Sequence, residues 1–177
     1  MTKSLRRGLV LALAPIVLVA LCMPPAPAIS STGHKDAQGK LNIVFVKASS
    51  SRDGIGRFEL GTEKRVRCRY LRTTKVRSLK WLFDDGRDGG FDLKGKFVCT
   101  KGHLFFHMRG TRTQNRYEPI RPKRPGRRSL VVRFPLDLAE LRAKHLWAAA
   151  KSRDGQSPGC TKPCRDRAPD SGFLNVY

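Results

Sequence analysis

The chain has 177 residues, a length that favours one domain with its own hydrophobic core. It carries 36 lysines and arginines against 14 aspartates and glutamates, so its formal net charge is +22. This charge excludes an ordinary neutral enzyme as the default. It points to a polyanionic partner: a nucleic acid, an acidic membrane surface or an acidic polysaccharide.

Residues 1–28 have the pattern of a secretory signal peptide. Basic residues precede an apolar run from Leu9 to Leu21, and Ala26-Pro27-Ala28 supplies the small-x-small cleavage pattern. The apolar run is shorter than the ~20 residues that a membrane-spanning helix needs. We therefore predict a secreted protein without an integral membrane segment.

Residues 29–60 are predicted to form a flexible start followed by a hairpin. The β-rich run 41–46, the turn at Asp53-Gly54 and the alternating run 57–60 together predict two antiparallel strands. A further short strand is expected at 65–68.

A helix is predicted next, beginning at Thr73 or Thr74 and ending at Phe83. Either threonine can cap its start. Val76, Leu79 and Phe83 recur at helical spacing and would form one apolar face.

The middle of the chain reads as strands separated by turns. Further strands are predicted at residues 96–99, 103–107, 116–120 and 129–134. A basic, proline-rich loop from Arg121 to Arg128 precedes the last of these.

The stretch Pro135–Lys151 supports two interpretations. Leu138, Leu141, His145 and Ala148 fall on one face of a helix, and the alanines favour helix by propensity. The family resemblance described below favours a strand over part of the same stretch.

Four cysteines follow the predicted signal peptide: Cys68, Cys99, Cys160 and Cys164. An even number in a secreted chain predicts two disulfides, and spacing alone leaves three connectivities open. Cys160 and Cys164 have the spacing of half a zinc site, but no matching second pair exists. We predict no metal and no cofactor.

The polar residues offer an inventory for metal-free RNA cleavage. That reaction needs a base for the 2′-hydroxyl, an acid for the leaving oxygen and cations for the phosphate. Glu118 is the only carboxylate between Asp92 and Asp137, and in a cationic surface it should stay ionised and able to accept a proton. His103, His107 and His145 are further candidates for acid–base or phosphate contacts.

The order of these features resembles the secreted fungal guanyl-specific ribonucleases and ribotoxins, and the ribonuclease-like effectors of plant-pathogenic fungi. The resemblance covers residues 61–165. It is carried by Val66–Tyr70 before the predicted helix, by Lys101–Phe105, by Tyr117-Glu118-Pro119-Ile120, by Pro125–Val132, and by His145 and Cys160.

The resemblance implies an α+β fold with an antiparallel sheet packed on one main helix, an N-terminal hairpin and stabilising disulfides. Glu118 would be the base, His145 the acid, and His103 with Arg127 or Arg128 the phosphate clamp. Arg121, Lys123, Arg124 and Arg127 would contact RNA. The resemblance also implies a disulfide between Cys68 and Cys160.

The predicted protein is therefore a monomeric, secreted, ribonuclease-like effector that binds RNA and acts on another organism. Cleavage of the RNA and delivery into host cells are both left open by the sequence. Residues 61–165 form its main domain and residues 166–177 a C-terminal tail. In an alternative alignment, Ala149 takes the place of the catalytic histidine, which predicts a non-catalytic effector that binds RNA or a host protein. A basic binder of membranes or polysaccharides, unrelated to ribonucleases, is the third interpretation.

Overall fold

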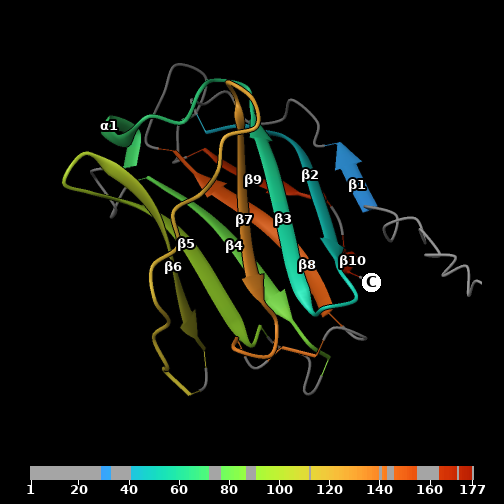
Figure 1. The fold of residues 1–177 in the computed structure, drawn as a ribbon. Coiled ribbons are helices and arrows are strands. Elements are labelled where there is room, and N and C mark those ends of the chain that lie inside the picture. The colour runs from blue at the N-terminus through green and yellow to red at the C-terminus, as the bar shows by residue number, and fades with distance from the viewer. Residues whose placement is uncertain are drawn as a thin grey trace, which may run out of the picture.

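The computed structural model shows two antiparallel β-sheets packed face to face (Figure 1). It is 57% strand and 4% helix, and the part of the chain that it describes contains no helix of seven residues or more. The residues described are 29–32, 41–71, 77–86, 91–111, 113–139, 141–142, 146–154, 164–170 and 172–176.

The first sheet has the order β1-β2-β3-β7 and contains the predicted hairpin. Its strands are β1 (Ile29–Thr32), β2 (Ile43–Ser50), β3 (Ile55–Thr62) and β7 (Ser129–Pro135). The turn between β2 and β3 contains Gly54, whose φ of 71° suits glycine. The hairpin and the strand predicted at 129–134 are confirmed.

The second sheet has the order β10-β8-β4-β5-β6, and β9 pairs with the other half of β8 beside β10. Its strands are β4 (Ser78–Asp84), β5 (Leu93–Thr100), β6 (His103–Gly110), β8 (Leu146–Arg153), β9 (Arg165–Ala168) and β10 (Leu174–Val176). The segment expected to be a C-terminal tail contains β10 and most of β9.

Residues 116–123 join the edges of the two sheets. Phe106 in β6 and Ile120 exchange two backbone hydrogen bonds of 2.7 and 3.0 Å, and Lys123 and Val131 in β7 exchange two of 2.8 Å. The segment covers the open edge of β6 and then that of β7, so neither edge can pair freely with another chain.

Aromatic side chains fill the space between the sheets. Phe58 of β3 lies 4.7 Å from Phe83 and 5.7 Å from Trp81 between ring centroids, and it stacks on Phe134 of β7 at 5.2 Å. All four residues are at least 97% buried. Such pairs stabilise a core beyond the area that they bury.

The predicted α+β fold with one main helix is wrong. The segment expected to be a helix ending at Phe83 contains β4, in which Leu79, Trp81 and Phe83 point into the core at every second position. Leu79 and Phe83 are therefore on one face by strand periodicity as well as by helix periodicity. Thr73, Thr74 and Val76 lie outside the described residues.

Two smaller predictions also change. The strand expected at 65–68 is replaced by an irregular segment that leads into α1 (Cys68–Leu71), a single helical turn. Residues 146–151 of the ambiguous stretch belong to β8, where Ala148, Ala149 and Ala150 are fully buried. Burial between neighbouring strands overrides the helix propensity of alanine there.

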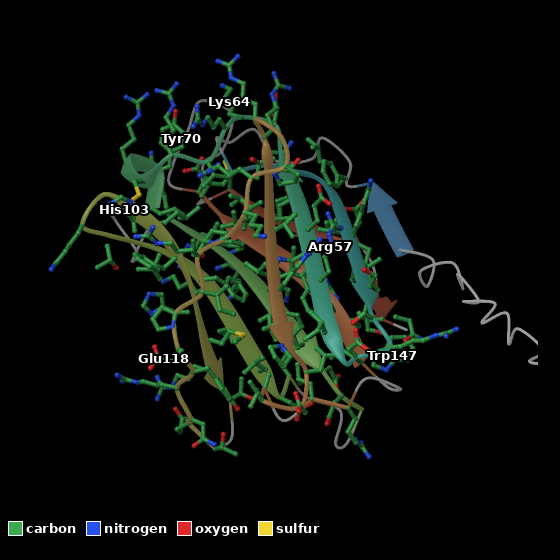
Figure 2. The ribbon with its side chains drawn as sticks, in the orientation of Figure 1. Arg57, Lys64, Tyr70, His103, Glu118 and Trp147 are labelled. Carbon is green, nitrogen blue, oxygen red and sulfur yellow. A yellow bond between two sulfur atoms is a disulfide. The ribbon has the colours of Figure 1, made fainter. Side chains whose placement is uncertain are left out.

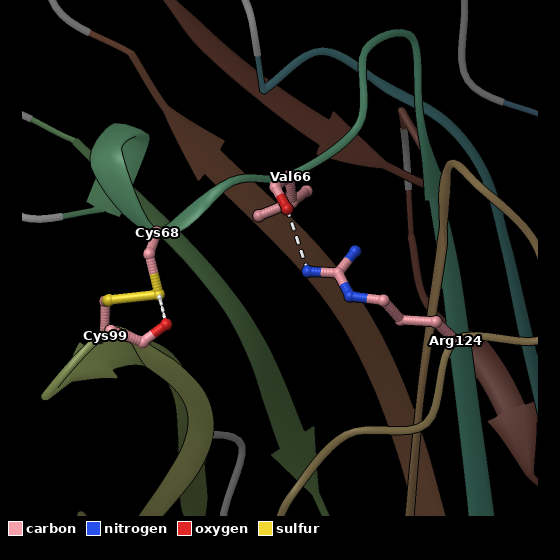
Figure 3. Close-up of a disulfide and its surroundings, with 5 residues drawn as sticks. Val66, Cys68, Cys99 and Arg124 are labelled. Carbon is pink, nitrogen blue, oxygen red and sulfur yellow. Dashed lines mark hydrogen bonds between the residues drawn. A yellow bond between two sulfur atoms is a disulfide. The ribbon is translucent and has the colours of Figure 1, made fainter.

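The disulfide implied between Cys68 and Cys160 is wrong because Cys68 bonds to Cys99 (Figure 3). α1 packs beside the end of β5 and brings the two Cα atoms to 5.3 Å. Cys164 is also disulfide-bonded, whereas Cys160 and the predicted signal peptide lie outside the described residues. No helix in the described ranges is long and apolar enough to cross a membrane.

We expect the double variant Cys68→Ser/Cys99→Ser to lose about 3–4 kcal/mol of unfolding free energy in urea. The bond closes a loop with a sequence separation of 31 residues, and cross-links of this length restrict the unfolded chain by that amount. A loss below about 1 kcal/mol would show that α1 is held in place without the bond.

Gly95 of β5 allows the ring of Phe106 to pack directly on the backbone. A Cβ at this position would lie 1.9 Å from the Phe106 ring, whereas a Cβ at Gly126 would meet only Ser129 Oγ at 3.5 Å. We expect Gly95→Ala to lower the unfolding free energy by about 1–3 kcal/mol through overpacking, and the control Gly126→Ala to change it by less than about 0.5 kcal/mol. Equal effects of the two substitutions would contradict this packing.

Candidate polyanion-binding face

A row of four cationic residues and one histidine crosses the outer face of the second sheet. Strand pairing places Arg167 opposite Lys151, Lys151 opposite Lys80, Lys80 opposite Lys96, and Lys96 opposite His107. These five residues, from β9, β8, β4, β5 and β6, are called the cationic row below. Because side chains of directly paired residues share one face, all five point away from the aromatic core.

More cations flank the row on the same face. Arg153 of β8 pairs with Arg165 of β9 on one side, and Lys94 of β5 pairs with Arg109 of β6 on the other. Lys80, Lys151, Arg153, Arg165 and Arg167 line a hollow of about 560 Å³. The cations therefore surround a concave surface that a ligand can enter.

The lysines of the row repel each other and are partly shielded from water. Burial lowers the pKa of Lys80, and the positive charges of Lys94, Lys151 and Lys96 lower it further. Burial and then the charge of Arg167 lower the pKa of Lys151. A bound anion would relieve this repulsion. Its attraction to the lysines would be strongest where solvent is partly excluded.

Carboxylates neutralise this face only in part. Asp166 and Asp170 also line the hollow, but Asp166 is 95% buried and its Oδ2 accepts a hydrogen bond from the Ile43 N–H across the sandwich. Five cations and two carboxylates line the hollow, so its lining carries a net positive charge.

Aromatic rings lie beside the cations. Lys151 Nζ is 5.5 Å from the Phe91 ring centroid, the Arg167 guanidinium is 4.8 Å from that of Phe173, and the two rings contact edge to face. At the other end of the cationic row, His107 and Phe105 meet edge to face on β6. Rings interleaved with cations are typical of surfaces that bind single-stranded nucleic acids.

Two of the predicted catalytic residues, Glu118 and His103, lie far apart. His103 begins β6, whereas the neighbour of Glu118, Tyr117, donates its N–H to the carbonyl of Met108, five residues along that strand. Strands rise about 3.3 Å per residue, so Glu118 and His103 are separated by about 16 Å along β6. Figure 2 labels both side chains, which lie well apart. Their catalytic roles stay predictions, and His145 lies outside the described residues.

The predicted RNA-binding arginines are divided between locations. The Arg121 guanidinium lies 5.5 Å from the Phe105 ring centroid, beside the end of the cationic row. Lys123 makes the backbone bridge to β7, and the carbonyl of Arg128, which follows Arg127, accepts a hydrogen bond from the Thr62 N–H where β3 ends. Arg124 lines a different hollow together with His103.

Sequence reasoning missed the cationic row itself. The signal lies in the alternation of lysine with apolar residues in Leu79-Lys80-Trp81 and in Gly95-Lys96-Phe97. This alternation places one lysine per strand on the solvent face. Because the segment of β4 was predicted to be a helix, Lys80 was not expected on a sheet. The other residues of the cationic row come into line only when the register between the strands is known.

No protein-family model matches the chain, and comparisons with curated proteins and with solved structures give no match either. Among the described residues, no group of three or more His, Cys, Asp or Glu side chains is placed to hold a metal ion.

Replacing Lys96 with glutamine should raise the pKa of Lys80, because one of the charges that lowers it is removed. The pKa of Lys80 can be followed by NMR of the lysine side-chain ε-methylene group. The control Lys47→Gln, on the first sheet, should leave it unchanged. An unchanged pKa in Lys96→Gln would show that the two side chains diverge.

Proposed function

We propose that the protein is a secreted RNA-binding protein that holds single-stranded RNA on the outer face of its second sheet. The observation that carries the proposal is the cationic row, which strand register places in line across five strands. Neighbouring strands lie about 4.8 Å apart, so the row extends over about 19 Å. That length matches a short segment of a linear polyanion.

Charge supplies the affinity in this proposal. A single strand loses counterions when lysines and arginines neutralise its phosphates, and log K falls with log salt by about 0.7 for each phosphate contacted. Four or five contacts along the row would give a slope of about −3. The net charge of +22 would also draw RNA toward the protein before specific contacts form.

Aromatic rings favour RNA over other polyanions. Phe105 and His107 stand at one end of the row, and Phe91 and Phe173 stand beside Lys151 and Arg167. Bases that are not paired can stack on such rings, whereas a sulfated polysaccharide has no aromatic face. Single-stranded RNA can contact the cationic side chains through its phosphates and the aromatic side chains through its bases.

The positions of the predicted catalytic residues favour RNA binding without cleavage. The separation of Glu118 from His103 leaves the predicted base far from the predicted phosphate clamp. RNA cleavage and action in another organism stay predictions of the resemblance to ribonuclease-like effectors.

The test is charge reversal on opposite faces of the sandwich. We expect Lys80→Glu/Lys96→Glu to weaken binding of a fluorescent single-stranded RNA at least about tenfold and to flatten the salt dependence by about one to two units of slope. The matched control Lys47→Glu/Arg133→Glu changes the same charge at exposed positions of the first sheet and should bind within about twofold of the wild type.

Circular dichroism should show that both variants keep the sheet structure. Equal losses in the two variants would contradict a localised RNA site and indicate attraction by net charge alone. Stronger binding of a sulfated polysaccharide or of anionic vesicles, with the same dependence on Lys80 and Lys96, would overturn RNA as the ligand.

A further inference from the structure

A second hollow lies at the α1 end of the sandwich and is built from other residues than the cationic row. It has a volume of about 350 Å³ and is lined by Arg65, Arg67, Cys68, Gly102, His103 and Arg124, with Val66 and Leu104 completing its wall. It is called the Arg124 pocket below. None of the residues that line it is acidic.

The Arg124 side chain is anchored by a hydrogen bond to the pocket wall. Its Nη2 donates a 2.8 Å hydrogen bond to the carbonyl of Val66, a residue 58 positions away in the chain (Figure 3). A guanidinium has five N–H groups, so one hydrogen bond to the wall leaves others for a ligand. The bond orients a charge that would otherwise sample many rotamers.

The opposite wall of the pocket is also constrained. The disulfide between Cys68 and Cys99 fastens α1 to β5, and Cys68 Sγ lies 3.1 Å from the carbonyl oxygen of Gly102. Gly102 and Lys101 have positive φ values of 80° and 48°, as a two-residue turn between β5 and β6 requires. His103 follows this turn directly, so its backbone position is set by the hairpin.

Charge in the pocket is concentrated and is not neutralised by its own walls. Burial lowers the pKa of Arg124, and the charge of Arg65 lowers it further. Arg65 and Arg67 are exposed and flank the buried Val66. Arginines that line one concave site can recognise phosphate by paired hydrogen bonds.

We propose that the Arg124 pocket binds a phosphate group carrying two negative charges, with Arg124, anchored by its hydrogen bond to Val66, as the central contact and Arg65, Arg67 and His103 as further contacts from the pocket lining. Inorganic phosphate and the terminal phosphate of a nucleic acid both provide such a doubly charged group. This site goes beyond the RNA-binding face and does not depend on it, because the two share no residue.

Titration with inorganic phosphate at low salt, followed by calorimetry, tests the proposal. We expect saturable binding that weakens at least about fivefold in Arg67→Gln and in Arg124→Gln, since each loses a charge-assisted contact. Arg116→Gln, an exposed arginine away from the pocket, is the matched control and should bind like the wild type. Arg67→Gln keeps the test valid even where Arg124→Gln, which also removes the hydrogen bond to Val66, lowers stability.

Two outcomes would overturn the proposal: absence of saturable phosphate binding, or binding unchanged in Arg67→Gln and Arg124→Gln. The variant Lys80→Glu/Lys96→Glu should bind phosphate normally, whether or not it binds RNA, so failure of the RNA-binding face would be seen separately. A loss of phosphate binding in that variant would assign the ion to the cationic row instead.

Oligonucleotides with and without a 5′-phosphate distinguish the two sources of the ligand. A preference for the 5′-phosphate that disappears in Arg67→Gln would support a nucleic-acid terminus. Equal affinity for both oligonucleotides, together with saturable binding of inorganic phosphate, would support the free ion.

Discussion

The packing of aromatic rings between the two sheets is the constraint on which the rest of the structure depends. Phe58 and Phe134 from one sheet meet Trp81 and Phe83 from the other, and these contacts set which face of each strand is buried. Since side chains alternate across a strand, burying Trp81 forces its neighbour Lys80 to the outside. The cationic row is therefore a direct consequence of the core: wherever β4, β5 and β8 pack inward, their lysines align outward.

The alignment of the lysines destabilises the folded protein, so other contacts have to hold these strands together. Like charges directly opposite each other in a sheet are destabilising, and burial lowers the pKa of both Lys80 and Lys151. The core, the disulfide between Cys68 and Cys99 and the segment that joins the sheet edges hold the strands in register against that repulsion. A surface that is unfavourable by itself and becomes favourable with a bound anion is typical of a binding site.

Sequence reasoning found strands where alternation and turn residues agreed, as in the hairpin of β2 and β3 and in β7. It failed where one pattern fits two periods: Leu79 and Phe83 satisfy both helix and strand spacing, and the alanines of β8 favour a helix until the neighbouring strands bury them. The disulfide partner of Cys68 depended on where α1 packs. The cationic row requires the register of five strands, and it includes the pairing of β4 with β8, which are far apart in the chain, so no single segment carried its signal.

The most direct measurement of the central claim is NMR mapping of a short single-stranded RNA on the ¹⁵N-labelled protein. We expect the chemical-shift changes to concentrate on outward-facing residues of β4, β5, β6 and β8, with Lys80, Lys96 and His107 among the largest. The outward-facing residues of the first sheet, such as Lys47 and Arg133, should change little. Shift changes spread evenly over both faces, or confined to the first sheet, would contradict RNA binding on the second sheet.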